Sequence, residues 1–280
     1  ALNAKQKVIE LSPQDADAYS NLGNTLQELG RLEEAEDSYR QAIALKSDDA
    51  KVHYNLANTL QELEKVEEAE ASYRYAITLK SDFASAHNNL GNILKKTGYL
   101  EEAEACYMRA VKFKPDYVEA HSNLGNLLTE LGQLKEPEKR LITAIVLKPD
   151  YAEAYNSLGN MFQKLGRLEK SELKYRQAMT LKSNYVDAYY NLGSTLHEQG
   201  RLDEAKASYK QAIALKSNFV EAHSNLGNTL LALGRLERAE ARYKRATVLK
   251  PDFTIGYRNL GSLFQELGEL ERSEAVYRLM

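Results

Sequence analysis

The chain has 280 residues, 43% of them hydrophobic, and 37 Lys and Arg against 40 Asp and Glu give a net charge of −3. This balance excludes a long-range attraction to nucleic acid or to an anionic membrane, because both require clustered cations. No apolar run approaches the ~20 residues that span a bilayer, and residues 1–5 lack the apolar core of a signal peptide. The single cysteine, Cys106, forms no internal disulfide and favours a reducing, cytoplasmic compartment.

A short polar and apolar phrase recurs along the chain with a constant period. Tyr19-Ser-Asn-Leu-Gly-Asn24 returns in similar form from His53 and again from His87, each time 34 residues later. Such a period predicts a repeat architecture without a linker. We expect the second helix of a partial repeat at 1–15, seven complete repeats at 16–49, 50–83, 84–117, 118–151, 152–185, 186–219 and 220–253, and a truncated eighth at 254–280.

Each repeat is predicted to be a pair of helices. In the first repeat, Leu22, Leu26 and Leu29 follow the spacing of one apolar helix stripe, which ends at Gly30. A second apolar stripe around Tyr39 predicts the partner helix. Glycine recurs at the turn position as Gly98, Gly132, Gly166, Gly200, Gly234 and Gly268.

Three residues depart from this pattern. Glu64 replaces the turn glycine of the second repeat, while Pro137 and Leu141 replace a small residue and a tyrosine in the fourth. Because proline is tolerated in the first turn of a helix, we expect a delayed or shortened second helix in that repeat.

Polar residues before the first helices suggest helix caps. Asp116 precedes Glu119 by three residues, which is the spacing of a capping box. Asp150 and Asn218 stand in the same relation to later glutamates. We therefore predict these three residues as N-caps.

One helical pair of this length cannot bury its apolar face alone, so neighbouring repeats must stack around a continuous core. The sequence predicts an all-α solenoid. Its recurring residues resemble the signature of the tetratricopeptide repeat family: Leu22, Gly23, Ala35, Tyr39 and Ala42, with their equivalents in later repeats. The resemblance implies a right-handed superhelix whose first helices line a concave groove.

A narrower resemblance lies in Ala-His-Ser-Asn-Leu-Gly-Asn, at 120–126 and 222–228. This phrase is similar to the tetratricopeptide arm of O-linked N-acetylglucosamine transferases and related bacterial proteins, in which asparagines of the first helices bind the substrate backbone. The resemblance implies a first row of Asn21, Asn55, Asn89, Asn123, Asn191, Asn225 and Asn259, interrupted by Ser157. A second row is expected on roughly the same face: Asn24, Asn58, Asn92, Asn126, Asn160 and Asn228.

The two rows are candidate peptide-binding residues. A side-chain amide offers one acceptor and two donors, which match the groups of an extended backbone whatever its side chains. The alternative is that the asparagines pair with neighbouring repeats and only tie the stack together.

Other polar residues favour packing over chemistry. Four histidines share one repeat position: His53, His87, His121 and His223. Tyrosine holds it elsewhere, at Tyr19, Tyr155, Tyr189 and Tyr257, so a flat ring with a polar edge is the requirement. Rings on stacked repeats, roughly 10 Å apart, are too distant to share a metal at ~2 Å. His197 is expected to face the groove, and Cys106 to be partly buried without a catalytic partner.

These observations predict a protein-interaction scaffold that binds an extended or helical segment, with no catalytic residue, metal or cofactor in this chain. An alternative is the substrate-recruiting arm of a larger glycosyltransferase. Asp17, Glu119 and Glu153 occupy positions where chaperone-binding relatives carry cations, which argues against a carboxylate clamp. We also expect uncovered apolar faces on the terminal helices, and end-to-end association through them.

Overall fold

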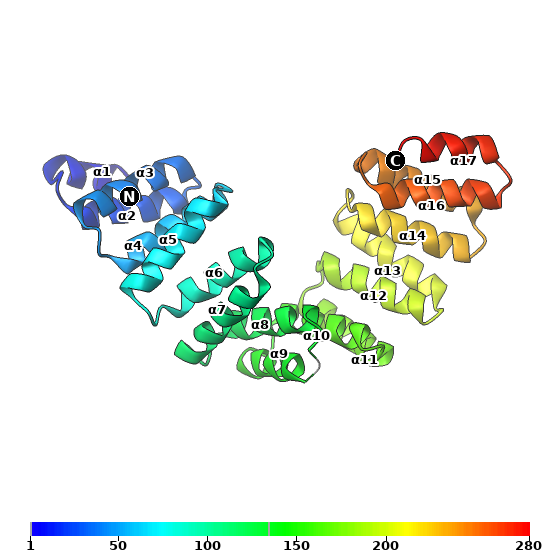
Figure 1. The fold of residues 1–280 in the computed structure, drawn as a ribbon, viewed down its shortest axis with the longest axis horizontal. Coiled ribbons are helices and arrows are strands. Elements are labelled where there is room, and N and C mark those ends of the chain that lie inside the picture. The colour runs from blue at the N-terminus through cyan, green and yellow to red at the C-terminus, as the bar shows by residue number, and fades with distance from the viewer. Residues whose placement is uncertain (1, 134) are drawn as a thin grey trace. The chain divides into compact units, whose positions relative to one another are not determined.

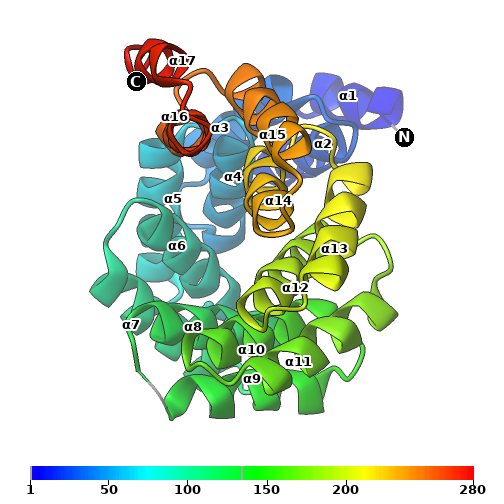
Figure 2. The same cartoon turned by 90° about the vertical axis from the view of Figure 1, so that its right-hand side faces the viewer.

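The computed structural model describes residues 2–133 and 135–280, in which all regular structure is helical, as predicted (Figures 1 and 2). The first helices of the pairs are α2 (Ala16–Glu28), α4 (Ala50–Glu62), α6 (Ala84–Lys96), α8 (Val118–Glu130), α10 (Ala152–Lys164), α12 (Val186–Glu198), α14 (Val220–Ala232) and α16 (Thr254–Glu266). The second helices are α1 (Leu2–Leu11), α3 (Leu32–Leu45), α5 (Val66–Leu79), α7 (Leu100–Phe113), α9 (Glu136–Leu147), α11 (Leu168–Leu181), α13 (Leu202–Leu215), α15 (Leu236–Leu249) and α17 (Leu270–Tyr277). None of the described helices is long and apolar enough to cross a membrane.

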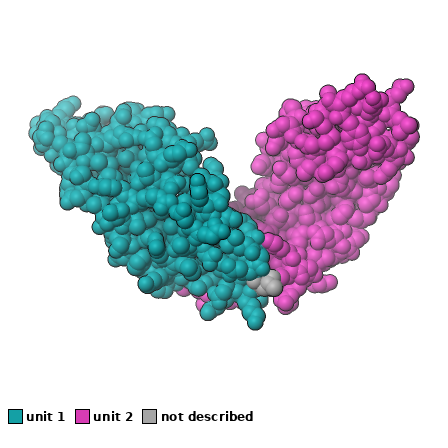
Figure 3. All heavy atoms as spheres, in the orientation of Figure 1, with its two compact units in different colours: residues 1–140 teal, residues 141–280 magenta. Residues whose placement is uncertain are grey.

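The helices belong to two compact units, unit 1 at residues 1–140 and unit 2 at residues 141–280 (Figure 3). Within each unit, a helix packs on its pair partner and on the next pair. Successive first helices also pack on each other, as α2 does on α4 and α12 on α14, whereas successive second helices in the described chain do not to this extent. We therefore call the side of the first helices the inner face of each unit, and the side of the second helices its outer face.

A buried tyrosine fills the space between the two helices of most pairs. The ring of Tyr107 lies against Gly91, where an added Cβ atom would be 2.7 Å from the ring. The same place is held by fully or almost fully buried rings at Tyr39, Tyr73, Tyr175, Tyr209 and Tyr243. In the fourth repeat the residue at the tyrosine position is Leu141, which is also buried. Where the first helix carries glycine, the large ring and the absent side chain are therefore complementary parts of one contact, and in the second repeat Ala57 stands at the glycine position.

The fourth repeat also has the shortened second helix that its sequence predicts. α9 begins at Glu136 with Pro137 in its first turn and has 12 residues, against 14 in α7. The proline nitrogen stands where no intrahelical bond would form, so the helix starts late rather than breaking.

The predicted caps at Asp116, Asp150 and Asn218 are wrong. The N-caps of the helices that follow are one residue later and aromatic, such as Tyr117 before α8, and they make no side-chain cap bond. Asp49 shows the register that a cap requires, since its carboxylate accepts from two backbone N–H groups of α4. With a period of 34 residues, Asp116 is equivalent to Asp48 and not to Asp49. It therefore lies one residue before the position that can cap the helix.

Glu64 is the only non-glycine residue with a positive φ in the described chain, at 61°, in a turn where other repeats place glycine. A residue with a Cβ atom is strained by about 1 kcal/mol in this left-handed conformation. We expect Glu64→Gly to raise the free energy of unfolding by about that amount in urea titrations. The matched reverse change, Gly98→Glu at φ 90°, should lower it. Equal stability of both variants and the wild type would contradict this account.

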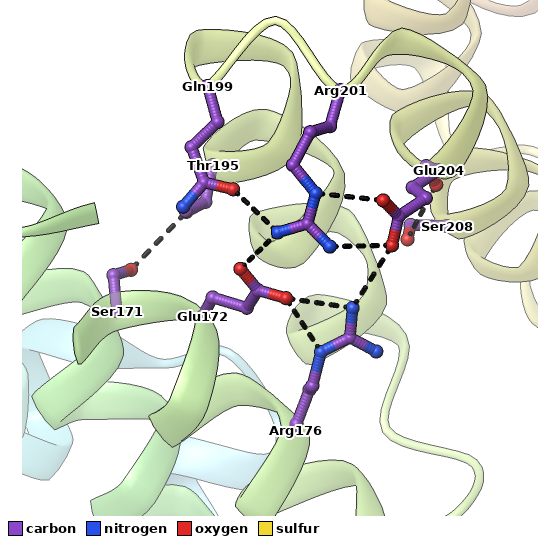
Figure 4. Close-up of polar contacts among 8 residues, drawn as sticks. All are labelled: Ser171, Glu172, Arg176, Thr195, Gln199, Arg201, Glu204 and Ser208. Carbon is purple, nitrogen blue, oxygen red and sulfur yellow. Dashed lines mark hydrogen bonds and ion pairs between the residues drawn. The ribbon is translucent and has the colours of Figure 1, made fainter. Parts of the chain in front are cut away.

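Ion pairs join consecutive second helices on the outer face. In unit 2, Arg201 lies between Glu172 of α11 and Glu204 of α13 (Figure 4). Its Nη1 donates to Glu172 at 2.5 Å, and its Nε and Nη2 donate to Glu204 at 2.8 and 2.7 Å. Burial alone would raise the pKa of Glu172, but hydrogen bonds from Arg201 and Arg176 hold that pKa below its ordinary value. Each exposed ion pair adds at most about 1 kcal/mol to the free energy of unfolding. These pairs therefore contribute more to the register of neighbouring helices than to the stability of the fold.

Candidate functional site

Both asparagine rows lie on the first helices, on the inner face of each unit. Members of a row occupy equivalent positions on successive helices, and the second row follows the first by three residues, nearly one helical turn. Most of these side chains are half-buried, while Asn21 and Asn160 are exposed. The sequence therefore placed the two rows on a common face.

A repeated chain of hydrogen bonds connects the rows. The Tyr107 hydroxyl donates to Oδ1 of Asn92 at 2.8 Å, and the same oxygen accepts from Nδ2 of Asn123 on the next first helix at 3.1 Å. The equivalent triplets are Tyr39, Asn24 and Asn55; Tyr73, Asn58 and Asn89; Tyr175, Asn160 and Asn191; and Tyr243, Asn228 and Asn259. In these triplets the first-row nitrogen ties its helix to the preceding pair, as the structural alternative predicts.

These bonds use only half of several amides, although Oδ1 of Asn89 also accepts from Nδ2 of Asn88 at 3.2 Å. The Oδ1 atoms of Asn55 and Asn123, and the Nδ2 atoms of Asn58 and Asn92, have no hydrogen-bond partner within the described residues and are not buried. The inner face of unit 1 therefore presents carbonyl acceptors from the first row beside N–H donors from the second. An extended backbone needs both kinds of group.

The free groups reach open space. A cavity of about 280 Å³ on the inner face of unit 1 is lined by Asn92, Lys95, Lys96, Tyr107 and Asn123. Both rows contribute to its wall, so a ligand there would meet an acceptor and a donor from neighbouring helices.

The bond chain is modified in two repeats. In the fourth, Leu141 takes the place of the tyrosine, and Ser157 replaces the next first-row asparagine. In the sixth, the hydroxyl of Ser194 lies 3.0 Å from that of Tyr209. Asn225 there donates to the Tyr190 hydroxyl at 3.0 Å.

Sequence reasoning missed a supporting set of polar residues. Asn88 accepts a second bond from the Asn123 amide at 3.0 Å, and Asn156 accepts one from Asn191 at 3.1 Å. Both are buried, and each directly precedes a row position. Their signal was a second polar residue directly before the row position, which the search for repeated asparagines passed over.

The histidine column packs at the joints between pairs. The Nε2 atom of His87 lies 2.9 Å from the Ser81 carbonyl oxygen, and His53, His121 and His223 make the same contact in their repeats. Within the described chain, no three or more His, Cys, Asp or Glu side chains gather as metal ligands. His197 stands apart, with its Nδ1 atom 3.0 Å from the Thr229 hydroxyl of the next first helix.

Buried histidines should make stability depend on pH. Burial and the charge of Arg109 lower the pKa of His87, and burial likewise lowers the pKa of His121 and His223. Because the folded-state pKa lies below the unfolded one, the stabilising contribution is complete above about pH 6.5 and is lost as the pH falls. We expect His87→Tyr, which installs the residue of other repeats, to lose less stability between about pH 7 and about pH 5 than the wild type in urea titrations. Identical losses would contradict this assignment.

Cys106 offers no reactive thiol. The side chain is 5% exposed in α7, and burial raises the pKa of the thiol. A protonated, enclosed thiol is a poor nucleophile, so Cys106 is a packing residue.

Family comparisons cover nearly the whole chain. Models described as "TPR repeat" match residues 23–64, 60–98, 91–132, 125–166, 159–200, 193–234 and 227–268, and one described as "Tetratricopeptide repeat" matches residues 6–37. None of the curated proteins matches the chain.

Solved structures share the fold. The APC/C hetero-tetramer Cut9–Hcn1 is similar over 94% of this chain, with a TM-score of 0.75 and 16% identity; this chain covers 52% of that one, about half its length. A tetratricopeptide repeat protein of Parabacteroides merdae matches 89% of this chain and 98% of its own, with a TM-score of 0.73 and 17% identity. A thermophilic TPR protein of Thermus thermophilus covers 65% of this chain and 99% of its own, with a TM-score of 0.58 and 25% identity.

Proposed function

Because the chain belongs to the tetratricopeptide repeat family, whose fold is typical of protein–protein interaction, we propose that the inner face binds an extended segment of a partner protein. The observation that supports this most is the pair of half-used asparagine rows. First-row Oδ1 atoms would accept from the N–H groups of the ligand backbone, and second-row Nδ2 atoms would donate to its carbonyl groups. Binding through the backbone tolerates many side chains, so the partner would be recognised with loose sequence preference.

Spacing favours an extended ligand over a helical one. Packed helices lie about 8–10 Å apart, and an extended chain advances about 3.3 Å per residue. A ligand running across the first helices would therefore meet one pair of amides about every three residues. A helical ligand has its own backbone groups paired internally, and it could not use the amides.

The first-row amides give a direct test. A neutral peptide selected from a random library on the wild-type protein serves as the ligand, and its affinity is compared with that of a variant carrying Asn89→Ala, Asn123→Ala and Asn225→Ala. At ~0.5–1.5 kcal/mol per lost bond, we expect affinity to fall roughly tenfold to about two-thousandfold. The melting temperature should fall as well, because Asn89 and Asn123 also donate between helices. A folded triple variant with unchanged affinity would contradict the proposal.

The glycosyltransferase alternative uses the same groove. The phrase at 120–126 and 222–228 would then belong to an arm that presents a protein substrate to a catalytic domain on the same polypeptide. The sequence of the full-length protein tests this: a nucleotide-sugar domain would support it, and repeats alone would contradict it.

End-to-end association remains a prediction. Val8 and Leu11 on α1, and Leu270 on α17, are exposed apolar side chains. Self-association through these helices should appear as a mass that rises with protein concentration in light scattering, and a constant mass would exclude it.

A further inference from the structure

Unit 2 has more cations than anions, and several of these cations line one cavity on its outer face. Residues 141–280 contain 20 Lys and Arg against 16 Asp and Glu, whereas residues 1–140 contain 17 against 24. A cavity of about 540 Å³ between α13 and α15 is lined by Lys206 and Lys210 of α13 and by Arg238, Arg242 and Arg245 of α15. The buried side chains of α14 that complete the lining are His223, Leu226 and Leu230. We call this cavity the basic groove.

At three other joints of the chain the equivalent positions carry opposite charges. At three joints, a cation of one second helix pairs with a glutamate of the next: Arg40 with Glu68 at 2.6 Å, Arg74 with Glu102 at 2.9 Å, and Arg176 with Glu204 at 3.5 Å. At the joint of α13 and α15 the equivalent residues are Lys210 and Arg238, two like charges. The pairing that joins the second helices at those three joints is therefore replaced by repulsion here, and, unlike Lys244 and Arg272 at the joint of α15 and α17, Lys210 and Arg238 share no glutamate of the described chain.

Comparison with unit 1 shows how far the change extends. The groove between α5 and α7 is lined by Arg74, Glu102, Cys106 and Arg109. These positions correspond to Lys210, Arg238, Arg242 and Arg245 of the basic groove. Lys206 likewise stands where α5 has Glu70, which pairs with Arg74 at 2.8 Å. These five positions thus carry two cations and two anions in the groove between α5 and α7. In the basic groove all five are cations.

The cations of the basic groove are largely uncompensated. Lys206 pairs with Asp203, but no carboxylate of the described chain forms an ion pair with Lys210, Arg238, Arg242 or Arg245. The nearby carboxylate of Glu240 is already engaged by Lys244 at 2.8 Å and by Arg272 at 2.5 Å. Clustered like charges destabilise a folded chain, so an anion that fills the groove would gain their full attraction.

We propose that the basic groove binds an acidic segment of a partner polypeptide. Arg238 and Arg245 are two helical turns apart, which at 1.5 Å per residue spreads the positive charge over about 10 Å. An extended segment covers that length with about three residues, so neighbouring Asp or Glu carboxylates reach cations on both helices. A single phosphate would engage the cations of one turn only. Bidentate contacts from the arginines to carboxylates supply the orientation.

This groove is independent of the asparagine rows. It lies on the second helices, on the outer face, and the rows lie on the inner face. Loss of acidic-segment binding would therefore leave the proposed inner-face function untouched.

Arg238→Glu tests the groove without endangering the fold. It places a glutamate opposite Lys210, the cation–glutamate arrangement that three other joints form with arginine, so we expect an equal or higher melting temperature. The probe is fluorescently labelled hexaglutamate, followed by anisotropy at low salt and again at physiological salt. We expect wild-type binding that weakens with salt, and a loss of about tenfold or more in Arg238→Glu. Lys46→Glu, the same charge change on an exposed residue of unit 1, should bind like the wild type.

Three results would overturn the proposal. Equal affinity of Arg238→Glu and the wild type would show that the groove does not bind the peptide. Displacement of hexaglutamate by an equimolar amount of inorganic phosphate would assign the groove to a phosphoryl group. Concentration-dependent self-association that is lost in Arg238→Glu would show that a second copy of this chain occupies it.

Discussion

Replacing Tyr107 by alanine is expected to lower the free energy of unfolding by about 3–5 kcal/mol. The ring is 1% exposed and fills the space in front of Gly91, so its removal leaves a cavity that a glycine cannot close. The change also removes the hydroxyl that donates to Asn92. Because stability in a repeat array comes from neighbour contacts, the loss should concentrate in α6, α7 and α8.

Tyr107→Phe is the matched control for this prediction. It keeps the ring and removes only the hydroxyl, so we expect a loss of about 0.5–1.5 kcal/mol. Guanidinium unfolding followed by circular dichroism measures both variants, and hydrogen exchange locates the loss. A cost below about 1 kcal/mol for Tyr107→Ala would contradict the assignment of this ring as the central packing residue of its pair.

Helix positions were predictable because their signals are local. The apolar stripe of Leu22 and Leu26 and the turn at Gly30 are read within one repeat, and the period carries them along the chain. The caps failed for a related reason: Asp48 and Asp49 are both acidic, and only the structure shows that Asp49 is the residue in register. An error of one residue is enough to turn a cap into a loop residue.

The candidate site was predictable as a surface but not atom by atom. Spacing placed Asn92 and Asn123 on one face, but the atoms that remain free depend on the hydroxyl of Tyr107, which arrives from another helix. The basic groove was hidden for a similar reason. In the sequence Arg238 is an ordinary charged residue of a helix surface. Only the structure shows that it lines the same cavity as Lys210 of the preceding second helix.

The second prediction with a large effect concerns the second-row amides. Asn58→Asp with Asn92→Asp replaces each free Nδ2 donor by an oxygen and keeps an oxygen for the internal bonds. Tyr73 and Tyr107 can still donate to these positions, and a charged acceptor strengthens such bonds. We therefore expect a melting temperature equal to that of the wild type or higher. Two lost donors should reduce the affinity for a neutral peptide roughly fivefold to 150-fold.

Asn184→Asp is the control for charge. This exposed loop residue occupies the position that holds Asp82 and Asp116 in earlier repeats, so the change is compatible with the fold. The affinity of the Asn184→Asp variant for the neutral peptide should match that of the wild type.

The central claim is tested most directly with the double variant Asn58→Asp, Asn92→Asp. Calorimetry measures the affinity of this variant for the neutral peptide and, separately, the melting temperature of the variant. If the asparagine rows form a peptide-binding surface, the affinity for the peptide falls while the melting temperature stays equal to that of the wild type or rises. Unchanged affinity in a fully stable double variant would show that these amides only join the repeats, and would contradict the proposed function.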